Sequence, residues 1–164
     1  MNTYKICIVG PASSGKTTYV HKLLNNTFSH HEPTLGVEVH PIRVSYDGLE
    51  AKLNREIEGT RICFNFWDCS GTYPGLRDGY YIQAKGGIVM VESIESDIDK
   101  HNLHVYIDEL RRIPGNENIK IVIVVSKSIE NNNEWFGEWP IFKVNSETNM
   151  GIMEPITYLA GVLA

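Results

Sequence analysis

The 164-residue sequence lacks the features that mark secreted, membrane-spanning and nucleic-acid-binding proteins. Its three cysteines lack the spacing of a zinc ligand set and are odd in number, which argues against a disulfide framework. No signal peptide precedes Tyr4, and no apolar run reaches the roughly 18 residues of a membrane-spanning helix. Its 15 basic residues are outnumbered by 20 acidic ones, which disfavours non-specific binding to nucleic acid or anionic membranes. We therefore expect a monomer without a membrane anchor, in the reducing environment of the cytoplasm, the nucleus or both.

One short segment carries most of the chemical information. Residues 10–17 read GPASSGKT and fit the P-loop pattern G-x-x-x-x-G-K-S/T, in which glycines let backbone N–H groups surround a phosphate. The segment lies between an apolar strand-like run at 4–9 and a helix-like segment at 17–25, whose N-terminal dipole favours an anion. We expect the basic side chain at position 16 to contact the β- and γ-phosphates and the hydroxyl at position 17 to bind Mg²⁺. The residues predicted to bind the nucleotide phosphates are Gly10, Ser13, Ser14, Gly15, Lys16, Thr17 and Thr18.

Strand-like and helix-like segments alternate along the rest of the chain. Two continuous apolar runs, 87–92 and 119–125, are typical of strands covered on both faces. Between them Leu103, Ile107 and Leu110 have helical spacing. Further strands are predicted at 36–46, 61–67 and 141–144, and a last helix at 151–163. The pattern predicts one doubly wound α/β domain over residues 1–164, with helices on both faces of about six mostly parallel strands and the ligand at their carboxyl ends.

The pattern also predicts one antiparallel hairpin strand with an enlarged tip at 47–59, although a short helix within 49–57 is an alternative. Cys7 and Cys63 lie in apolar strand-like runs and are expected in the core. The aromatic side chains of Trp135 and Trp139 are expected to cover the end of the sheet rather than to form an exposed patch.

A metal ligand and a γ-phosphate contact are predicted at the end of the second hairpin strand. Residues 67–71 read WDCSG, so that Asp68 follows the strand and Gly71 lies three residues later. A carboxylate at a strand end can hold the Mg²⁺ shell, and a glycine N–H can contact a γ-phosphate. A D-x-x-G pattern is informative here because it follows a P-loop and a hairpin.

Three further runs resemble the Ran family of small GTPases: TLGVEVHP at 34–41, FNFWD at 64–68 and GLRDGYYIQA at 75–84. The resemblance extends in order over nearly the whole chain and implies a P-loop NTPase fold of the small GTPase type. It also implies a GTP/GDP switch that uses Mg²⁺ and acts on nuclear transport factors. By the same resemblance Thr34 and Asp68 complete the metal and switch site, and segments 34–41 and 72–84 contact Ran regulators or transport receptors.

The sequence departs from this family at the position that orients the attacking water. The family places a glutamine directly after D-T-A-G, whereas Thr72 follows Gly71 here. A threonine hydroxyl cannot both accept a hydrogen bond from water and reach a phosphate oxygen as an amide can. We therefore expect the reaction GTP + H₂O → GDP + phosphate to be slow or to depend on an activator, with catalytic contributions from Lys16, Thr34, Gly71 and Thr72.

The guanine-reading motifs also differ from the family. Where the family has N-K-x-D, residues 126–129 read SKSI, so that Ile129 replaces the aspartate that accepts hydrogen bonds from guanine. Glu130 is one position late, and a local bulge would be needed to bring it to the base. Lys127 is expected to pack against the purine ring. Asn145 and Ser146 occupy the positions of the first two residues of the family's S-A-K motif, and both are expected to contact the base.

These departures leave three hypotheses open. The first is a Ran-like GTP/GDP switch, the second a catalytically impaired Ran mimic that occupies Ran's partners, and the third a P-loop protein with relaxed base specificity. His30 and His31 beside Glu32 are interpreted as a solvated loop rather than a metal site, because no second cluster in the sequence has ligand spacing.

Overall fold

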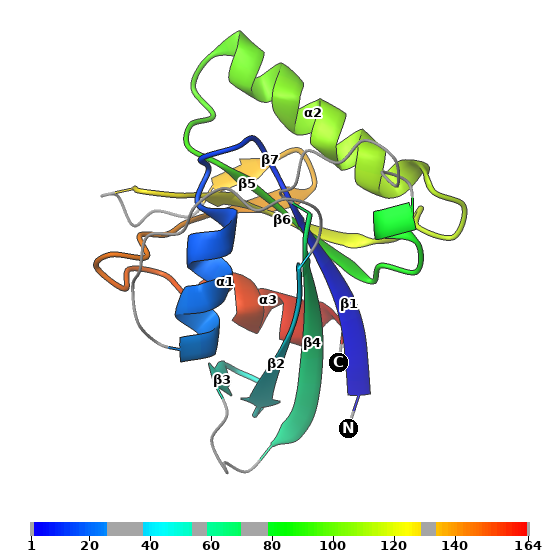
Figure 1. Ribbon diagram of the computed structural model, residues 1–164, viewed down its shortest axis with the longest axis vertical. Coiled ribbons are helices and arrows are strands. Elements are labelled where there is room, and N and C mark those ends of the chain that lie inside the picture. The colour runs from blue at the N-terminus through cyan, green and yellow to red at the C-terminus, as the bar shows by residue number, and fades with distance from the viewer. Residues whose placement is uncertain (1, 26–37, 54–58, 70–78, 129–133, 164) are drawn as a thin grey trace.

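The computed structural model describes residues 2–25, 38–53, 59–69, 79–128 and 134–163, which form one sheet with helices on both sides (Figure 1). The strands are β1 (Asn2–Val9), β2 (Glu38–Tyr46), β3 (Ala51–Leu53), β4 (Thr60–Asp68), β5 (Gly86–Val91), β6 (Lys120–Val125), β7 (Glu134–Phe136) and β8 (Trp139–Lys143). The helices are α1 (Lys16–Asn25), α2 (Asp97–Arg112) and α3 (Glu154–Leu163), and a short 3-10 helix spans Gly79–Tyr81. Within these residues no helix is long and apolar enough to cross a bilayer.

The order of the strands identifies where a ligand should bind. Across the sheet the order is β3-β2-β4-β1-β5-β6-β8-β7, and β4, β1, β5, β6 and β8 pair in parallel. From β1 the chain first builds the sheet toward β4 and β2, and later toward β5, β6 and β8. A reversal of this kind leaves a crevice at the carboxyl ends of the central strands. The predicted fold class is confirmed, and the segment that follows β1 at this crevice is the P-loop sequence.

Among the described residues the sheet has eight strands, two more than the six or so predicted. Both additions, β3 and β7, are three-residue edge strands that pair antiparallel with β2 and β8. Segments this short show no periodicity that a sequence pattern can reveal. The strand β3 lies inside the predicted hairpin tip, so the alternative of a helix is wrong for residues 51–53; residues 54–58 lie outside the described part.

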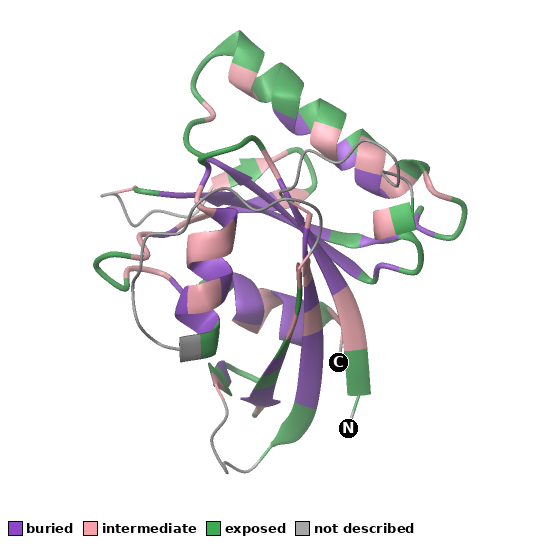
Figure 2. Cartoon of the chain, viewed as in Figure 1, coloured by how far each residue is buried: buried purple, intermediate pink, exposed green. Residues whose placement is uncertain are grey.

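Side chains of the central strands alternate between two cores. In β1, Ile6 and Ile8 face a core shared with α1 and α3, whereas Cys7 and Val9 face a core shared with α2. This is the period of two that a strand imposes. Figure 1 shows α2 on one side of the sheet and α1 and α3 on the other, and Figure 2 shows buried residues along the strands between them. Cys63 is also buried, as predicted for both strand cysteines.

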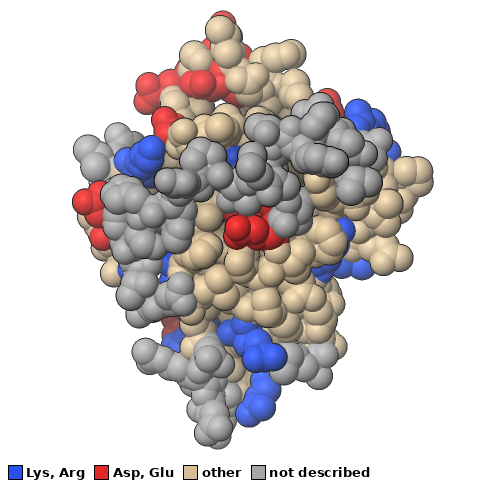
Figure 3. All heavy atoms as spheres, in the orientation of Figure 1, with Lys and Arg blue, Asp and Glu red and all other residues tan. Residues whose placement is uncertain are grey.

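The helix α2 packs as its sequence predicts, and a capping box marks its start. Ser96 is its N-cap: the hydroxyl oxygen accepts from the Asp99 N–H at 3.0 Å, and the Asp99 carboxylate accepts from the Ser96 N–H at 3.2 Å. Leu103, Ile107 and Leu110 are buried on one face. Figure 3 shows acidic side chains at the end of the molecule where α2 begins, a placement that the helix dipole favours.

The aromatic residues near the end of the sheet correct one prediction. Trp135 lies on the edge strand β7 and is 61 % exposed, so it does not cover the sheet. Trp139 does so in part, because its ring packs against the α2-side core and lies 6.5 Å from the ring of Phe136. The difference arises because consecutive positions of a short hairpin alternate faces, which sequence spacing alone could not assign before β7 was known.

Candidate nucleotide-binding site

The loop after β1 has the backbone conformation of a phosphate cradle. Gly10, Ser13 and Gly15 have φ values of 149°, 67° and 92°. At Gly10 a Cβ atom would overlap the carbonyl oxygen of Met90 on β5, so the position is closed to other residues. Positive φ at positions of a loop lets its backbone N–H groups turn toward a bound anion. The positive φ of Ser13 is one that a non-glycine residue rarely adopts, and such strain often marks functional loops.

The Lys16 side chain folds back over this loop. Its Nζ donates to the carbonyl oxygens of Gly10 and Pro11 at 2.7 and 2.6 Å, and lies 3.4 Å from the hydroxyl of Ser14. Lys16 is only 3 % exposed. Burial lowers its pKa to about 8, and the nearby Asp68 carboxylate opposes that change. The amine is therefore held over the loop in a site poor in compensating negative charge, which is a site suited to a bound anion.

The predicted metal ligands Thr17 and Asp68 meet across two elements. The Thr17 hydroxyl at the start of α1 donates to Oδ2 of Asp68 at 2.6 Å. Asp68 is fully buried at the carboxyl end of β4, where it pairs with Ile8 of β1. A hydroxyl and a carboxylate are the hard oxygen donors that Mg²⁺ prefers. This donor pair fits Mg²⁺, and the ion would stand beside the phosphate loop.

Lys127 connects the loop after β6 to the phosphate loop. Its Nζ lies 2.8 Å from Oε1 of Glu92 and 3.5 Å from the carbonyl oxygen of Ser13. The preceding residue, Ser126, is buried and lies next to Gly15, since a Cβ on that glycine would be 3.6 Å from the serine Cβ. The structure therefore brings Lys127 beside the P-loop, and its packing against a purine ring stays a prediction. Glu92, at the end of β5, is a partner that no sequence motif indicated.

The predicted base-contacting residues also meet the loop after β6. Asn145 donates from Nδ2 to the carbonyl oxygen of Ser128 at 3.2 Å. Its Oδ1 accepts from the N–H groups of Glu147 and Thr148 at 3.0 and 3.1 Å. The side chain of Asn145 therefore joins two loops and shapes its own turn. Ser146 lies in that same turn and is half-buried.

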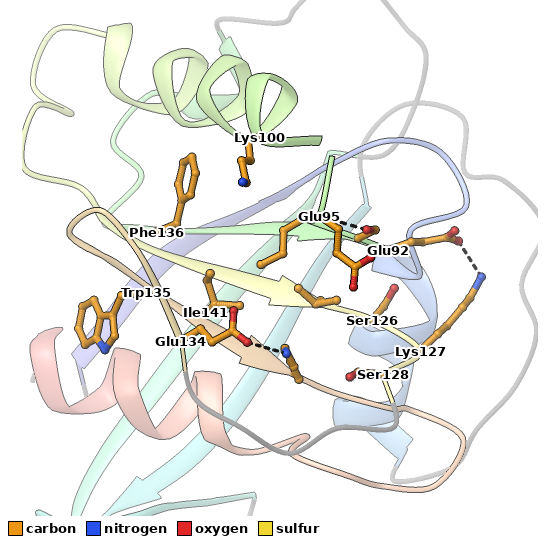
Figure 4. A pocket seen from close by; sticks show the side chains of 14 residues that line it. Glu92, Glu95, Lys100, Ser126, Lys127, Ser128, Glu134, Trp135, Phe136 and Ile141 are labelled. Atoms are coloured by element: carbon orange, nitrogen blue, oxygen red, sulfur yellow. Dashed lines mark hydrogen bonds and ion pairs between the residues drawn. The ribbon is translucent and has the colours of Figure 1, made fainter. Parts of the chain in front are cut away.

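A cavity of about 640 Å³ lies on the α2 side of Lys127 (Figure 4). Two ion pairs cross its wall: Lys127 with Glu92 at 2.8 Å, and Lys143 with Glu134 at 2.9 Å. Its lining comes from the ends of β5 and β6, the start of α2 and the β7–β8 hairpin. The Lys127–Glu92 pair forms the border between this cavity and the phosphate loop.

Several predicted positions lie outside the described residues. These are Thr34, Gly71, Thr72, Ile129, Glu130 and the group His30, His31 and Glu32. Within the described part of the run at 75–84, Tyr81 is buried and its neighbour Tyr80 is partly buried.

Comparison with protein families gives one match over residues 5–129, to the family described as "Ras of Complex, Roc, domain of DAPkinase". The chain belongs to this family. The matched range includes the whole P-loop, Asp68 and Lys127, and it ends before Asn145. The Roc domain is a Ras-like GTPase domain, so the expectation of a small GTPase-type domain is confirmed, and GTP or GDP with Mg²⁺ is what this type of domain generally binds. The narrower resemblance to Ran stays a prediction.

Proposed function

We propose that this Roc-family domain is a GTP/GDP switch that binds Mg²⁺ and hydrolyses GTP slowly or only with an activator. The observation that supports it best is the hydrogen bond between Thr17 and the buried Asp68, beside a P-loop over which Lys16 is folded. In this proposal the backbone of residues 10–15 surrounds the phosphates, with Ser13, Ser14 and Thr18 adding hydroxyls. Lys16 leaves its carbonyl partners to contact the β- and γ-phosphates.

The hydrolytic step depends on positioning, because phosphoryl transfer needs an aligned water and stabilised charge rather than covalent chemistry. Mg²⁺, when bound through Thr17, Thr34 and Asp68, would supply neutralisation of the phosphate charge. Gly71 would donate its N–H to the γ-phosphate. Thr72 stands where relatives have a glutamine that orients water, so the domain's own alignment of that water is weak. An activator could complete the site, since an arginine supplied by a partner raises such rates by about 10³–10⁵.

The most direct test identifies the nucleotide that co-purifies with the protein and then follows phosphate release. We expect guanine nucleotide, and phosphate release that accelerates in a Thr72→Gln variant. Thr17→Val keeps the side-chain shape but removes the hydroxyl, and should weaken Mg²⁺-dependent nucleotide binding. Thr60→Val is a matched control, because that threonine is exposed at the far end of β4 from Asp68. Adenine nucleotide, or binding that Thr17→Val leaves unchanged, would contradict the proposal.

The Ran-like assignment is the finer part of the proposal. It rests on the runs at 34–41 and 75–84, and predicts that the protein binds Ran regulators or transport receptors through segments 34–41 and 72–84 in the cytoplasm or the nucleus. Guanine nucleotide without turnover, together with binding to those partners, would favour the alternative of a Ran mimic. Absence of any competition with Ran for its receptors would contradict both.

Relaxed base specificity is a second candidate that a particular observation favours. The Asn145 side chain is engaged by Ser128, Glu147 and Thr148, and Ile129 cannot accept hydrogen bonds from guanine. A buried hydrogen-bond donor without an acceptor, here on guanine, costs about 1–3 kcal/mol. The preference for GDP over ADP should therefore be smaller by about that amount than in a small GTPase with the full N-K-x-D motif. Calorimetry with both nucleotides measures it, and a large GDP preference would exclude this candidate.

A further inference from the structure

A second group of polar side chains lies one helical turn from the phosphate loop. His21 on α1 and Glu38 and His40 on β2 bring their ligand atoms within 4.8 Å of one another. Oε2 of Glu38 lies 3.0 Å from Nε2 of His40 and 3.9 Å from Nε2 of His21. The two imidazole rings meet edge to face, with centroids 5.3 Å apart. All three side chains are partly exposed, at 25 %, 43 % and 21 % for His21, Glu38 and His40.

Ordinary helix and strand geometry brings the three together. His21 follows Thr17 by four residues and so shares its face of α1. Glu38 and His40 are two residues apart on β2 and so share a face of the sheet. Ile42, the next residue on that face, is buried in the core that contains α1. The cluster therefore forms where the outer end of this core reaches solvent.

The donor set is that of a transition-metal site. Two imidazoles and a carboxylate are ligands that Zn²⁺ takes at about 2.0–2.2 Å, which puts tetrahedral ligands about 3.3 Å apart. The separations of 3.0 and 3.9 Å from the Glu38 oxygen lie on either side of that value, and the third separation, between His21 and His40, is at most 4.8 Å. Partial exposure leaves room for water as a fourth ligand. Mg²⁺ prefers oxygen donors and near-octahedral geometry, so this cluster selects a different ion from the Thr17–Asp68 pair.

We propose that His21, Glu38 and His40 form a binding site for a divalent transition metal of the Zn²⁺ class. His21 precedes residues 26–37 in the chain, and Glu38 and His40 follow them. A metal held by all three ties α1 to the start of β2, on both sides of the segment that contains Thr34. Because the ion binds only the folded arrangement, it stabilises the fold by mass action. The proposal is independent of the identity of the nucleotide.

The test is a Zn²⁺ titration of the full chain in competition with a chromophoric chelator, with Mg²⁺ in excess so that oxygen sites are occupied. We expect one equivalent of Zn²⁺ to bind. His21→Ala, His40→Ala and Glu38→Gln should each weaken binding at least tenfold, since even the outer-shell partners of metal ligands are worth 10–100-fold in affinity. Glu38→Gln preserves side-chain shape, so it guards against a loss of folding that an alanine variant could cause.

Three controls separate this site from other zinc ligands. His101→Ala removes an exposed histidine of α2 and should leave the affinity unchanged. Cys69→Ser tests the thiol next to Asp68, and a double change of His30 and His31 to alanine tests the histidines outside the described residues. Saturable binding that the His21, Glu38 and His40 variants leave intact, binding lost in Cys69→Ser or in the double variant instead, or no saturable binding at all would overturn the proposal.

A thermal melt gives an independent measurement. Zn²⁺ should raise the melting temperature of the natural chain and of His101→Ala, and should raise it much less in the three site variants. A rise of equal size in all of them would show that Zn²⁺ acts elsewhere, and would overturn the assignment of these ligands. Either result is obtained whether or not the protein hydrolyses GTP.

Discussion

The buried amine of Lys16 makes a prediction about stability that can be worked from the structure. In the nucleotide-free protein its pKa falls from 10.5 to about 8, because burial disfavours the charged form. A difference of this size between the unfolded and folded chain costs about 3 kcal/mol of folding stability at pH 7. Replacing Lys16 by methionine, which has a similar length and no charge, removes that cost together with the three polar contacts of Nζ.

The sign of the pH dependence follows from proton binding. Between pH 8 and 10.5 the unfolded chain holds the Lys16 proton and the folded chain has released it. Stability due to this group therefore rises with pH across that window. The free energy of unfolding of the natural chain, compared with that of Lys16→Met, should therefore rise by about 2 to 3 kcal/mol between pH 7 and pH 10. Tyr19, whose pKa burial raises, contributes in the opposite direction, and its contribution cancels in the comparison of the two proteins. Cys69, whose pKa is raised by its hydrogen bond with Cys7 and by burial, also contributes in the opposite direction.

Urea unfolding at several pH values measures this difference after bound nucleotide has been removed. Lys120→Met is the control, because Lys120 is exposed at the start of β6 and its removal should leave the pH dependence unchanged. Phosphate groups would pair with the amine and restore its ordinary pKa, so added GDP should abolish the effect in the natural chain. A difference between natural chain and Lys16→Met that is the same at pH 7 and pH 10 would refute the reasoning.

Three other substitutions test separate parts of the structure. Gly10→Ala should abolish nucleotide binding and destabilise the fold by about 1–3 kcal/mol, because φ at Gly10 is 149° and the Met90 carbonyl leaves no room for a Cβ atom. Calorimetry and urea unfolding measure the two effects, and unchanged nucleotide binding would contradict the prediction. Ser96→Ala should cost about 1 kcal/mol of stability through loss of the α2 N-cap while leaving nucleotide affinity unchanged, as unfolding and binding measurements can show. Leu110→Ala should cost about 2–5 kcal/mol in urea unfolding because the side chain is fully buried; a loss under 1 kcal/mol would mean that the α2 packing is wrong.

The phosphate half of the site was predictable because its constraints are local. Gly10 and Gly15 need backbone conformations that few residues adopt, and Lys16 and Thr17 follow at fixed positions on the first turn of a helix. Predicting the position of Asp68 required one further inference, because the parallel register of β4 with β1 places this residue beside Thr17. An apolar strand ending in aspartate one hairpin after a P-loop was enough to anticipate that step.

The base half was less predictable because it forms where separate loops meet. The partner of Lys127 is Glu92, from the end of β5, and the role of Asn145 in joining Ser128 to its own turn depends on how β6 and β8 pair. Neither contact has a sequence period or a motif. The short strand β7, and with it the exposure of Trp135, was missed for the same reason.

The cluster of His21, Glu38 and His40 depends both on spacing in the sequence and on how α1 packs against β2. The sequence shows only the spacing within each element, and neither spacing alone indicates a metal site: His21 lies one turn after Thr17, and Glu38 and His40 are two apart in a strand. The sequence could not show that α1 packs against this end of β2. It also could not show the sheet register, which sets Glu38 opposite Asp68. The Thr17 hydroxyl donates to Asp68, so the packing that brings these two residues together also brings the histidine cluster together one turn away. A change in how α1 sits on β2 and β4 should therefore alter both sites together, whereas a change in the loops around Lys127 and Asn145 should alter base recognition alone.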